Sequence, residues 1–227
     1  MDVHVITGLR ADGTSNATTG EPDRFSNAPA DVLARYVASA NQLGREVGMR
    51  PEWCVAAARL GQRALPALGF RDVRTVGVQV GVQNAAAVDL AARGMSMDRW
   101  PPHAWSVGVQ GTGISDGNGW DGHLVNIATD SRSGRRRRWL VDVTLDQVTR
   151  ADRGLHVRPL VGQVADGFLR GDVTVLMTAE GNLLTYRRLR HLKGAVHIPR
   201  WTDEVLVPTL TKALVEVART APLSVPA

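Results

Sequence analysis

The sequence predicts an α+β fold in which helices pack on an antiparallel sheet. Two segments, 29–48 and 50–69, carry apolar residues at the spacing of an amphipathic helix. Residues 76–83 then alternate valine with glycine or glutamine, and this period of two is typical of a strand with one buried face. Further strand patterns bounded by turns follow, and a last helical pattern begins near Thr202. Helices, then strands, then a helix is the order expected of an α+β domain.

The composition is that of a folded globular chain. It has 227 residues, of which 44% are hydrophobic and 22% are charged, enough to bury a substantial core. No apolar run approaches the roughly 18 residues that span a bilayer, and the N-terminus lacks the pattern of a secretory signal. We therefore expect a cytoplasmic protein with no membrane partner. A single cysteine excludes an intramolecular disulfide and a multi-thiolate zinc site, and no metal or other cofactor is expected.

Three parts are expected along the chain: a flexible segment over 1–28, a folded domain over 29–200, and a C-terminal helix with a tail over 201–227. Most of the first part is small, polar and rich in turn-forming residues, with no apolar period. In the last part, Thr202 or Asp203 is expected to cap the helix.

The two N-terminal helices have recognisable beginnings and ends. Pro29 suits the first turn of one helix, because its fixed φ angle and its missing N–H are tolerated there. The other helix is expected to begin at Pro51 and Glu52 and to be closed by Pro66 and Gly69. Both helices precede the first strand of the domain.

The strands are expected to form hairpins. A turn over 130–138 separates the strand pattern 123–129 from the pattern 139–148, and a second hairpin over 172–189 turns at 180–182. Because the strands of a hairpin pair with each other, this order favours an antiparallel sheet. The remaining expected elements are a short helix over 84–93 and a strand over 103–111.

Cys54 is the only cysteine, and it falls in the expected first turn of a helix, three residues after Pro51. Unpaired backbone N–H groups and the positive end of the helix dipole favour a thiolate at such a position. The functional hypothesis is a nucleophile, and a small buried core residue is the alternative. The choice depends on whether the chain also supplies a base and a residue that orients the base.

His123 and Asp142 have the sequence context of these missing parts. His123 begins a strand directly after the glycine-rich segment 113–122. Asp142 interrupts an apolar strand pattern, where a carboxylate is costly unless a partner pairs with it. If the two strands form the predicted hairpin, Asp142 lies beside His123 and fixes the tautomer of its imidazole. The sequence therefore predicts a Cys-His-Asp triad.

This order of motifs resembles the transglutaminase-like branch of the papain-like cysteine superfamily. The resemblance consists of a cysteine at a helix N-terminus, then "GH-L-V" on one strand and "W-L-V-D-V-T-L-D-Q" on the next, and it covers roughly residues 50–150. Small bacterial and phage members share the ending that is found here at Asp142, Thr144, Asp146 and Gln147. Arylamine N-acetyltransferases have a similar core order, but "PEWC" and "VTLDQ" argue against that family proper.

The resemblance implies a papain-like core with Cys54 as nucleophile, His123 as general base and acid, and Asp142 as the orienting carboxylate. The chain departs from the family at Leu124, where an aromatic residue usually follows the histidine. A family-like "HAW" occurs instead at His103, which makes His103 the rival base and a candidate for the substrate pocket. His123 is preferred because its strand is next in sequence to the strand that carries Asp142.

Other residues near these motifs are candidates for the substrate pocket or the oxyanion hole. Trp53 and Trp120 flank the site in sequence and are hypothesised to line the acyl pocket, with ordinary packing as the alternative. Gln147 is a further pocket candidate, although a structural role beside the aspartate strand is favoured for it and for Asp146. The oxyanion donors considered, besides the backbone N–H of the nucleophile, are Asn41, Gln42 and Trp53.

The charge balance is basic, with a formal net charge of +5 and basic clusters at Arg135–Arg138 and 186–194. A nucleic-acid partner is an alternative reading that is not favoured, because a solvated hairpin tip explains the same pattern. We expect instead an acyl or amide substrate, of protein or peptide type, and a cysteine-dependent amidohydrolase, protease or acyltransferase. Water and amine acceptors both fit. The alternative from another class is a catalytically silent transglutaminase-like protein that binds or assembles with a partner.

Overall fold

The computed structural model describes residues 3–6, 17–20, 28–48, 53–109, 122–131, 136–153, 155–178, 180–189 and 207–220. The helices are α1 (Pro29–Glu46), α2 (Cys54–Ala67), α3 (Ala85–Ala92) and α4 (Val207–Thr220). The strands are β1 (Val3–Ile6), β2 (Ala17–Gly20), β3 (Arg71–Gln83), β4 (Ser106–Val109), β5 (His123–Asp130), β6 (Arg137–Asp142), β7 (Leu160–Val164), β8 (Thr174–Met177) and β9 (Leu183–Arg188). Short 3-10 helices are η1 (Met97–Arg99), η2 (Leu145–Val148), η3 (Ala151–Arg153) and η4 (Asp166–Arg170).

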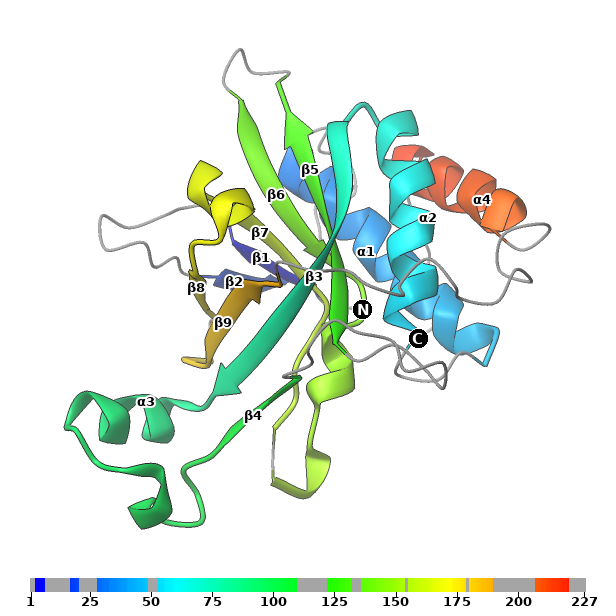
Figure 1. Cartoon of the computed structure of the whole chain (residues 1–227). Helices are drawn as coiled ribbons and strands as arrows, with labels where there is room; N and C mark the ends of the chain where they lie inside the picture. The colour runs from blue at the N-terminus through cyan, green and yellow to red at the C-terminus, as the bar shows by residue number, and fades with distance from the viewer. Residues whose placement is uncertain are drawn as a thin grey trace.

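The strands form one strongly twisted sheet in the order β2-β1-β7-β6-β5-β3-β9-β8, with β4 also paired to β3 (Figure 1). Every strand pair is antiparallel except β1 with β7, which is parallel. The α+β class is therefore confirmed, and so are the two predicted hairpins, β5–β6 and β8–β9. No described helix is long and apolar enough to cross a membrane.

Three parts of the sheet differ from the sequence prediction. β1 and β2 pair with each other within the range 1–28, which was expected to be flexible, and β1 continues the sheet beside β7. β7 was not predicted from the sequence. Four of its five residues, on both faces, are buried, so its sequence does not alternate between apolar and polar residues. The predicted strand 139–148 ends instead at Asp142, where the carboxylate accepts a hydrogen bond from the backbone N–H of Thr144 and turns the chain into η2.

Helices α1, α2 and α4 cover one face of the sheet, at the right of Figure 1. The buried side chains between these helices and the sheet include Leu33, Tyr36, Leu65, Trp139 and Val161. The opposite face curls around a second core that includes Val78, Val80, Ile127, Leu140 and Leu184. Between β3 and β4 the chain leaves the sheet as an arm that contains α3 and η1, seen at the lower left of Figure 1.

The close packing of α2 on the sheet depends on Gly61. Asn126 of β5 is buried and donates from Nδ2 to the backbone carbonyl of Ala58 at 3.0 Å. A Cβ at position 61 would overlap the side-chain amide of Asn126. Because this hydrogen bond joins α2 to the strand that begins with His123, it fixes the height of the helix relative to that strand.

Gly61→Ala is therefore expected to lower the free energy of unfolding by about 1–3 kcal/mol, because either Asn126 or α2 must move. Urea denaturation of the two proteins measures the difference. Gly81→Ala is the matched control, since a Cβ at position 81 meets no atom within 4 Å. An equal loss of stability in both variants would contradict the role given to Gly61 in packing α2 against Asn126.

Candidate active site

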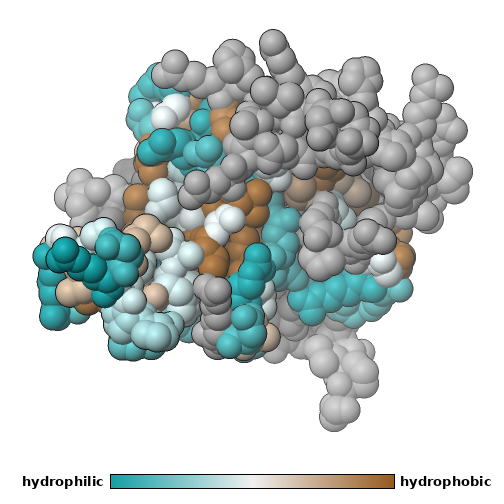
Figure 2. Space-filling model, turned by 60° about the horizontal axis from the view of Figure 1, so that its bottom comes forward, coloured by the Kyte–Doolittle hydropathy of each residue, from teal (hydrophilic) through white to brown (hydrophobic). Residues whose placement is uncertain are grey.

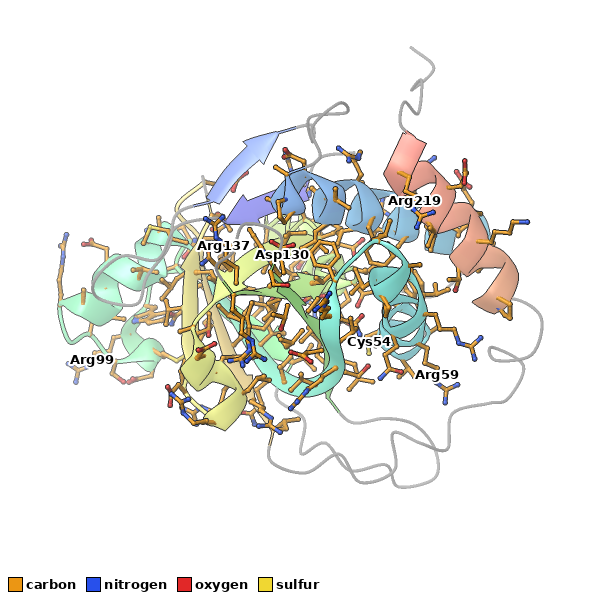
Figure 3. All side chains as sticks on the ribbon, turned by 90° about the horizontal axis from the view of Figure 1, so that it is seen from above. Cys54, Arg59, Arg99, Asp130, Arg137 and Arg219 are labelled. Atoms are coloured by element: carbon orange, nitrogen blue, oxygen red, sulfur yellow. The ribbon has the colours of Figure 1, made fainter. Side chains whose placement is uncertain are left out.

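Cys54 is the first residue of α2, as predicted for a nucleophile in the first turn of a helix. Trp53 precedes it at the N-cap, and its carbonyl accepts a hydrogen bond from the N–H of Ala57 at 3.0 Å. First-turn N–H groups have no acceptor within the helix, so they stabilise negative charge at this end. Cys54 is 3% exposed and lies where α2 meets the sheet, as Figure 3 shows. Pro51 and Glu52, expected to begin the helix, lie outside the described residues.

His123 and Asp142 form the predicted pair. Nε2 of His123, at the start of β5, lies 2.8 Å from Oδ2 of Asp142, at the end of β6, and both side chains are 0% exposed. The register of the hairpin sets Asn126 opposite Val141. Continuing it by one residue sets Val125 opposite Asp142, so His123 and Asp142 are diagonal neighbours on one face of the sheet.

Asp142 is held by two further hydrogen bonds. The hydroxyl of Tyr186 on β9 donates to Oδ2 at 2.9 Å, and the backbone N–H of Thr144 donates to Oδ1 at 3.2 Å. Strands β3 and β5 lie between β9 and β6, so Tyr186 reaches across the inner face of the curled sheet. Burial raises the pKa of Tyr186 well above its usual value, and Asp142 raises it further, which keeps the hydroxyl a donor. Tyr186 was not among the residues predicted from the sequence.

Opposing effects set the charge of His123. Burial disfavours the imidazolium and lowers its pKa. The charge and the hydrogen bond of Asp142 raise the pKa of His123, and the hydrogen bond and charge of Cys54 raise it further. The resulting pKa is about 10. With this pKa the ring, which lies against Asp142 through Nε2, is protonated at neutral pH.

This raised pKa predicts how stability changes with pH. Histidine titrates near 6.5 in the unfolded chain and at about 10 in the folded chain, so the folded state holds the proton more tightly. The stabilisation is complete below about pH 6.5 and is lost as pH rises through about 10. Urea denaturation should show the free energy of unfolding falling by a few kcal/mol over this window, a slope absent from His123→Gln. The same slope in both proteins would contradict the charged pair.

Gln147 is the third group at the ring. Its side-chain Nε2 contacts Nδ1 of His123, and the residue is half-buried. Its turn, η2, is anchored on α1 through Asp146, which accepts a hydrogen bond from Asn41 at 3.2 Å and pairs with Arg45 at 2.7 Å. Asp146 thus has the structural role favoured from the sequence, whereas Gln147 belongs to the site.

The two oxyanion candidates on α1 use their amides in other contacts. Asn41 donates from Nδ2 to the carbonyl of Val143 at 2.7 Å and to Asp146, so these donors hold the turn after β6. Gln42 is exposed and donates to Glu46 at 2.8 Å. Helical spacing along α1 does not show which of its polar residues faces the site.

The remaining predicted site residues lie apart from the His123 ring or outside the described residues. The indole of Trp53 packs on Gly44 of α1, where a Cβ would overlap the ring, so Trp53 joins α1 to α2. His103, the rival base, is exposed on the arm, and its carbonyl accepts a hydrogen bond from Asn84. Trp120 lies outside the described residues.

The arginine run at the β5–β6 hairpin is partly neutralised by acidic residues. Arg136 pairs with Asp72 at 2.8 Å, and Arg138 pairs with Asp166. These pairs reduce the positive potential that a phosphate backbone would meet. The parts of the two basic clusters outside the described residues are Arg135 and 190–194.

Within the described stretches, no group of three or more His, Cys, Asp or Glu side chains is arranged to hold a metal ion. No protein-family model matches the chain, and no curated protein or solved structure is significantly similar to it. Function must therefore be inferred from the geometry of Cys54, His123, Asp142 and Gln147.

Proposed function

We propose that this chain is a cysteine-dependent enzyme that forms a thioester on Cys54, as an amidohydrolase, protease or acyltransferase with a papain-like core. The observation that carries the proposal is the buried ring of His123, which contacts Asp142 through Nε2 and whose pKa is raised by both Asp142 and Cys54. A thiol that only fills space in a core needs no such neighbours, because burying ionisable groups beside it is costly. The resemblance to the transglutaminase-like branch points to the same chemistry.

Acylation begins from the pair in which Nδ1 of His123 holds the proton of the Cys54 thiol. The thiolate attacks the carbonyl carbon of an amide, a C–S bond forms, and the carbonyl electron pair moves to the oxygen. Collapse of this intermediate breaks the C–N bond, and His123 gives its Nδ1 proton to the departing amine. Asp142 keeps Nδ1 directed at the thiol throughout.

Deacylation reverses these roles. Neutral His123 takes a proton from water or from an amine as that acceptor attacks the thioester carbon. The C–S bond breaks, and the sulfur leaves as the thiolate beside the protonated ring. Water yields a carboxylic acid, and an amine yields a new amide. The protein is ready for a further cycle in either case.

Reaction with p-nitrophenyl acetate tests the proposal, because this ester is small enough for a cysteine that is 3% exposed. We expect a burst of about one equivalent of p-nitrophenolate per chain, and an acetyl group located on Cys54 by mass spectrometry of the acid-quenched protein. Cys54→Ala, a small replacement suited to the buried site, should lose the burst. Absence of a burst from wild-type protein, or acetylation confined to lysines, would contradict the proposal.

A further inference from the structure

We propose that Gln147 donates a hydrogen bond to the substrate oxygen that becomes negatively charged when Cys54 is acylated. The inference rests on the thioester chemistry proposed above and gives Gln147 a catalytic role in place of a purely structural one. Two of the side chains that the sequence suggested for this task, Asn41 and Gln42, use their amides elsewhere: Asn41 donates to groups in the turn after β6, and Gln42 donates to Glu46 on the surface.

Gln147 and Cys54 both act on the ring of His123. Nε2 lies 2.8 Å from Asp142, and the Gln147 amide contacts Nδ1. Because Nε2 is occupied, we assign the hydrogen bond between Cys54 and the ring to Nδ1 as well. Two groups within hydrogen-bonding distance of one nitrogen lie at most about 7 Å apart. A carbonyl group bonded to the sulfur therefore comes within reach of the Gln147 amide.

The protonation of His123 determines what the amide of Gln147 can do. The carboxylate of Asp142 is an acceptor, so Nε2 carries a hydrogen. In the protonated ring Nδ1 carries the second hydrogen, so it cannot accept from the N–H of the Gln147 amide that contacts it. That N–H can therefore donate to the substrate oxygen when the oxyanion forms.

The position of Gln147 suits this role. Gln147 is half-buried, whereas Cys54, His123 and Asp142 are buried, so Gln147 borders the side from which a substrate arrives. Its turn is fixed to α1 by Asp146, and donors held in place in advance stabilise an oxyanion best. Figure 2 views the end of the molecule at which α2 begins, where a hydrophobic area lies between hydrophilic regions.

Two chemical probes separate this role from a positioning role. Acylation by p-nitrophenyl acetate passes through an oxyanion, whereas iodoacetamide alkylates the thiolate by displacing iodide and forms none. In Gln147→Ala, the rate constant for acylation is expected to fall about 10²–10³-fold. The rate constant for alkylation is expected to change by less than about threefold. Gln147→Met keeps the side-chain size without the donor and should behave in the same way.

Gln42→Ala is the matched control, because it removes an exposed amide and should alter neither rate constant. If acylation and alkylation fall in parallel in both Gln147 variants, Gln147 acts by positioning His123, and the proposal is overturned. An unchanged acylation rate overturns it as well. Wild-type protein that is alkylated but never acylated contradicts the proposed function itself, so the two failures are distinguishable.

Discussion

Replacing His123 by glutamine is expected to slow acylation of Cys54 by p-nitrophenyl acetate about 10²–10⁴-fold at neutral pH. Glutamine can still hydrogen-bond to Asp142, but it cannot take the thiol proton. Alanine is a less informative replacement, because it leaves Asp142 buried without its partner and would cost about 3–5 kcal/mol of stability. The rate constant is measured from the burst of p-nitrophenolate.

His103→Gln is the control for this experiment. His103 is exposed on the arm, away from the buried pair, so its replacement should leave the acylation rate unchanged. Equal losses in the two variants, or a normal rate in His123→Gln, would show that His123 is not the base. A loss confined to His103→Gln would assign that role to the rival histidine.

Replacing Asp142 by asparagine is the second change with a large expected effect, on the order of 10³–10⁴-fold in the acylation rate. The amide of asparagine can donate to Nε2 of His123, which moves the ring hydrogen to Nδ1 and leaves no acceptor for the thiol proton. The substitution also removes the negative charge that does most to raise the pKa of His123, so that pKa is expected to fall.

The pH dependence of acylation distinguishes these effects from simple unfolding. Asp142→Asn should shift the pH profile as well as lower its maximum, whereas partial unfolding lowers the rate without moving the profile. Asp72→Asn removes an exposed carboxylate that pairs with Arg136 and should alter neither. An unshifted profile in Asp142→Asn protein with a normal circular dichroism spectrum would contradict the role given to Asp142.

The parts of the site that the sequence predicts are those set by local structure. Cys54 falls in the first turn of α2 because a helical pattern follows it, and His123 meets Asp142 because one hairpin joins their strands. Both inferences need only the period of a helix or strand and the position of a turn. The same reasoning correctly predicts α1, α2, α3 and the β8–β9 hairpin.

The residues that the sequence analysis misses or misplaces depend on contacts distant in the sequence. Tyr186 reaches Asp142 only because the sheet curls and brings β9 opposite β6. The amide of Asn41 donates to the turn after β6, which packs on α1 although it is about 100 residues away in the sequence. β7 could not be predicted, because a strand buried on both faces shows no alternation of apolar and polar residues.

The central claim is that Cys54 and His123 act as a pair, and the rate of alkylation by iodoacetamide as a function of pH tests it most directly. An unassisted thiol ionises near about pH 8.5, so its alkylation rate rises roughly tenfold for each pH unit below that value. In wild-type protein we expect a shallower rise with pH, because a protonated ring of His123 beside the sulfur favours the thiolate. In His123→Gln we expect the steep rise of an ordinary thiol. The same steep rise in both proteins would contradict the pair and the enzyme proposed from it.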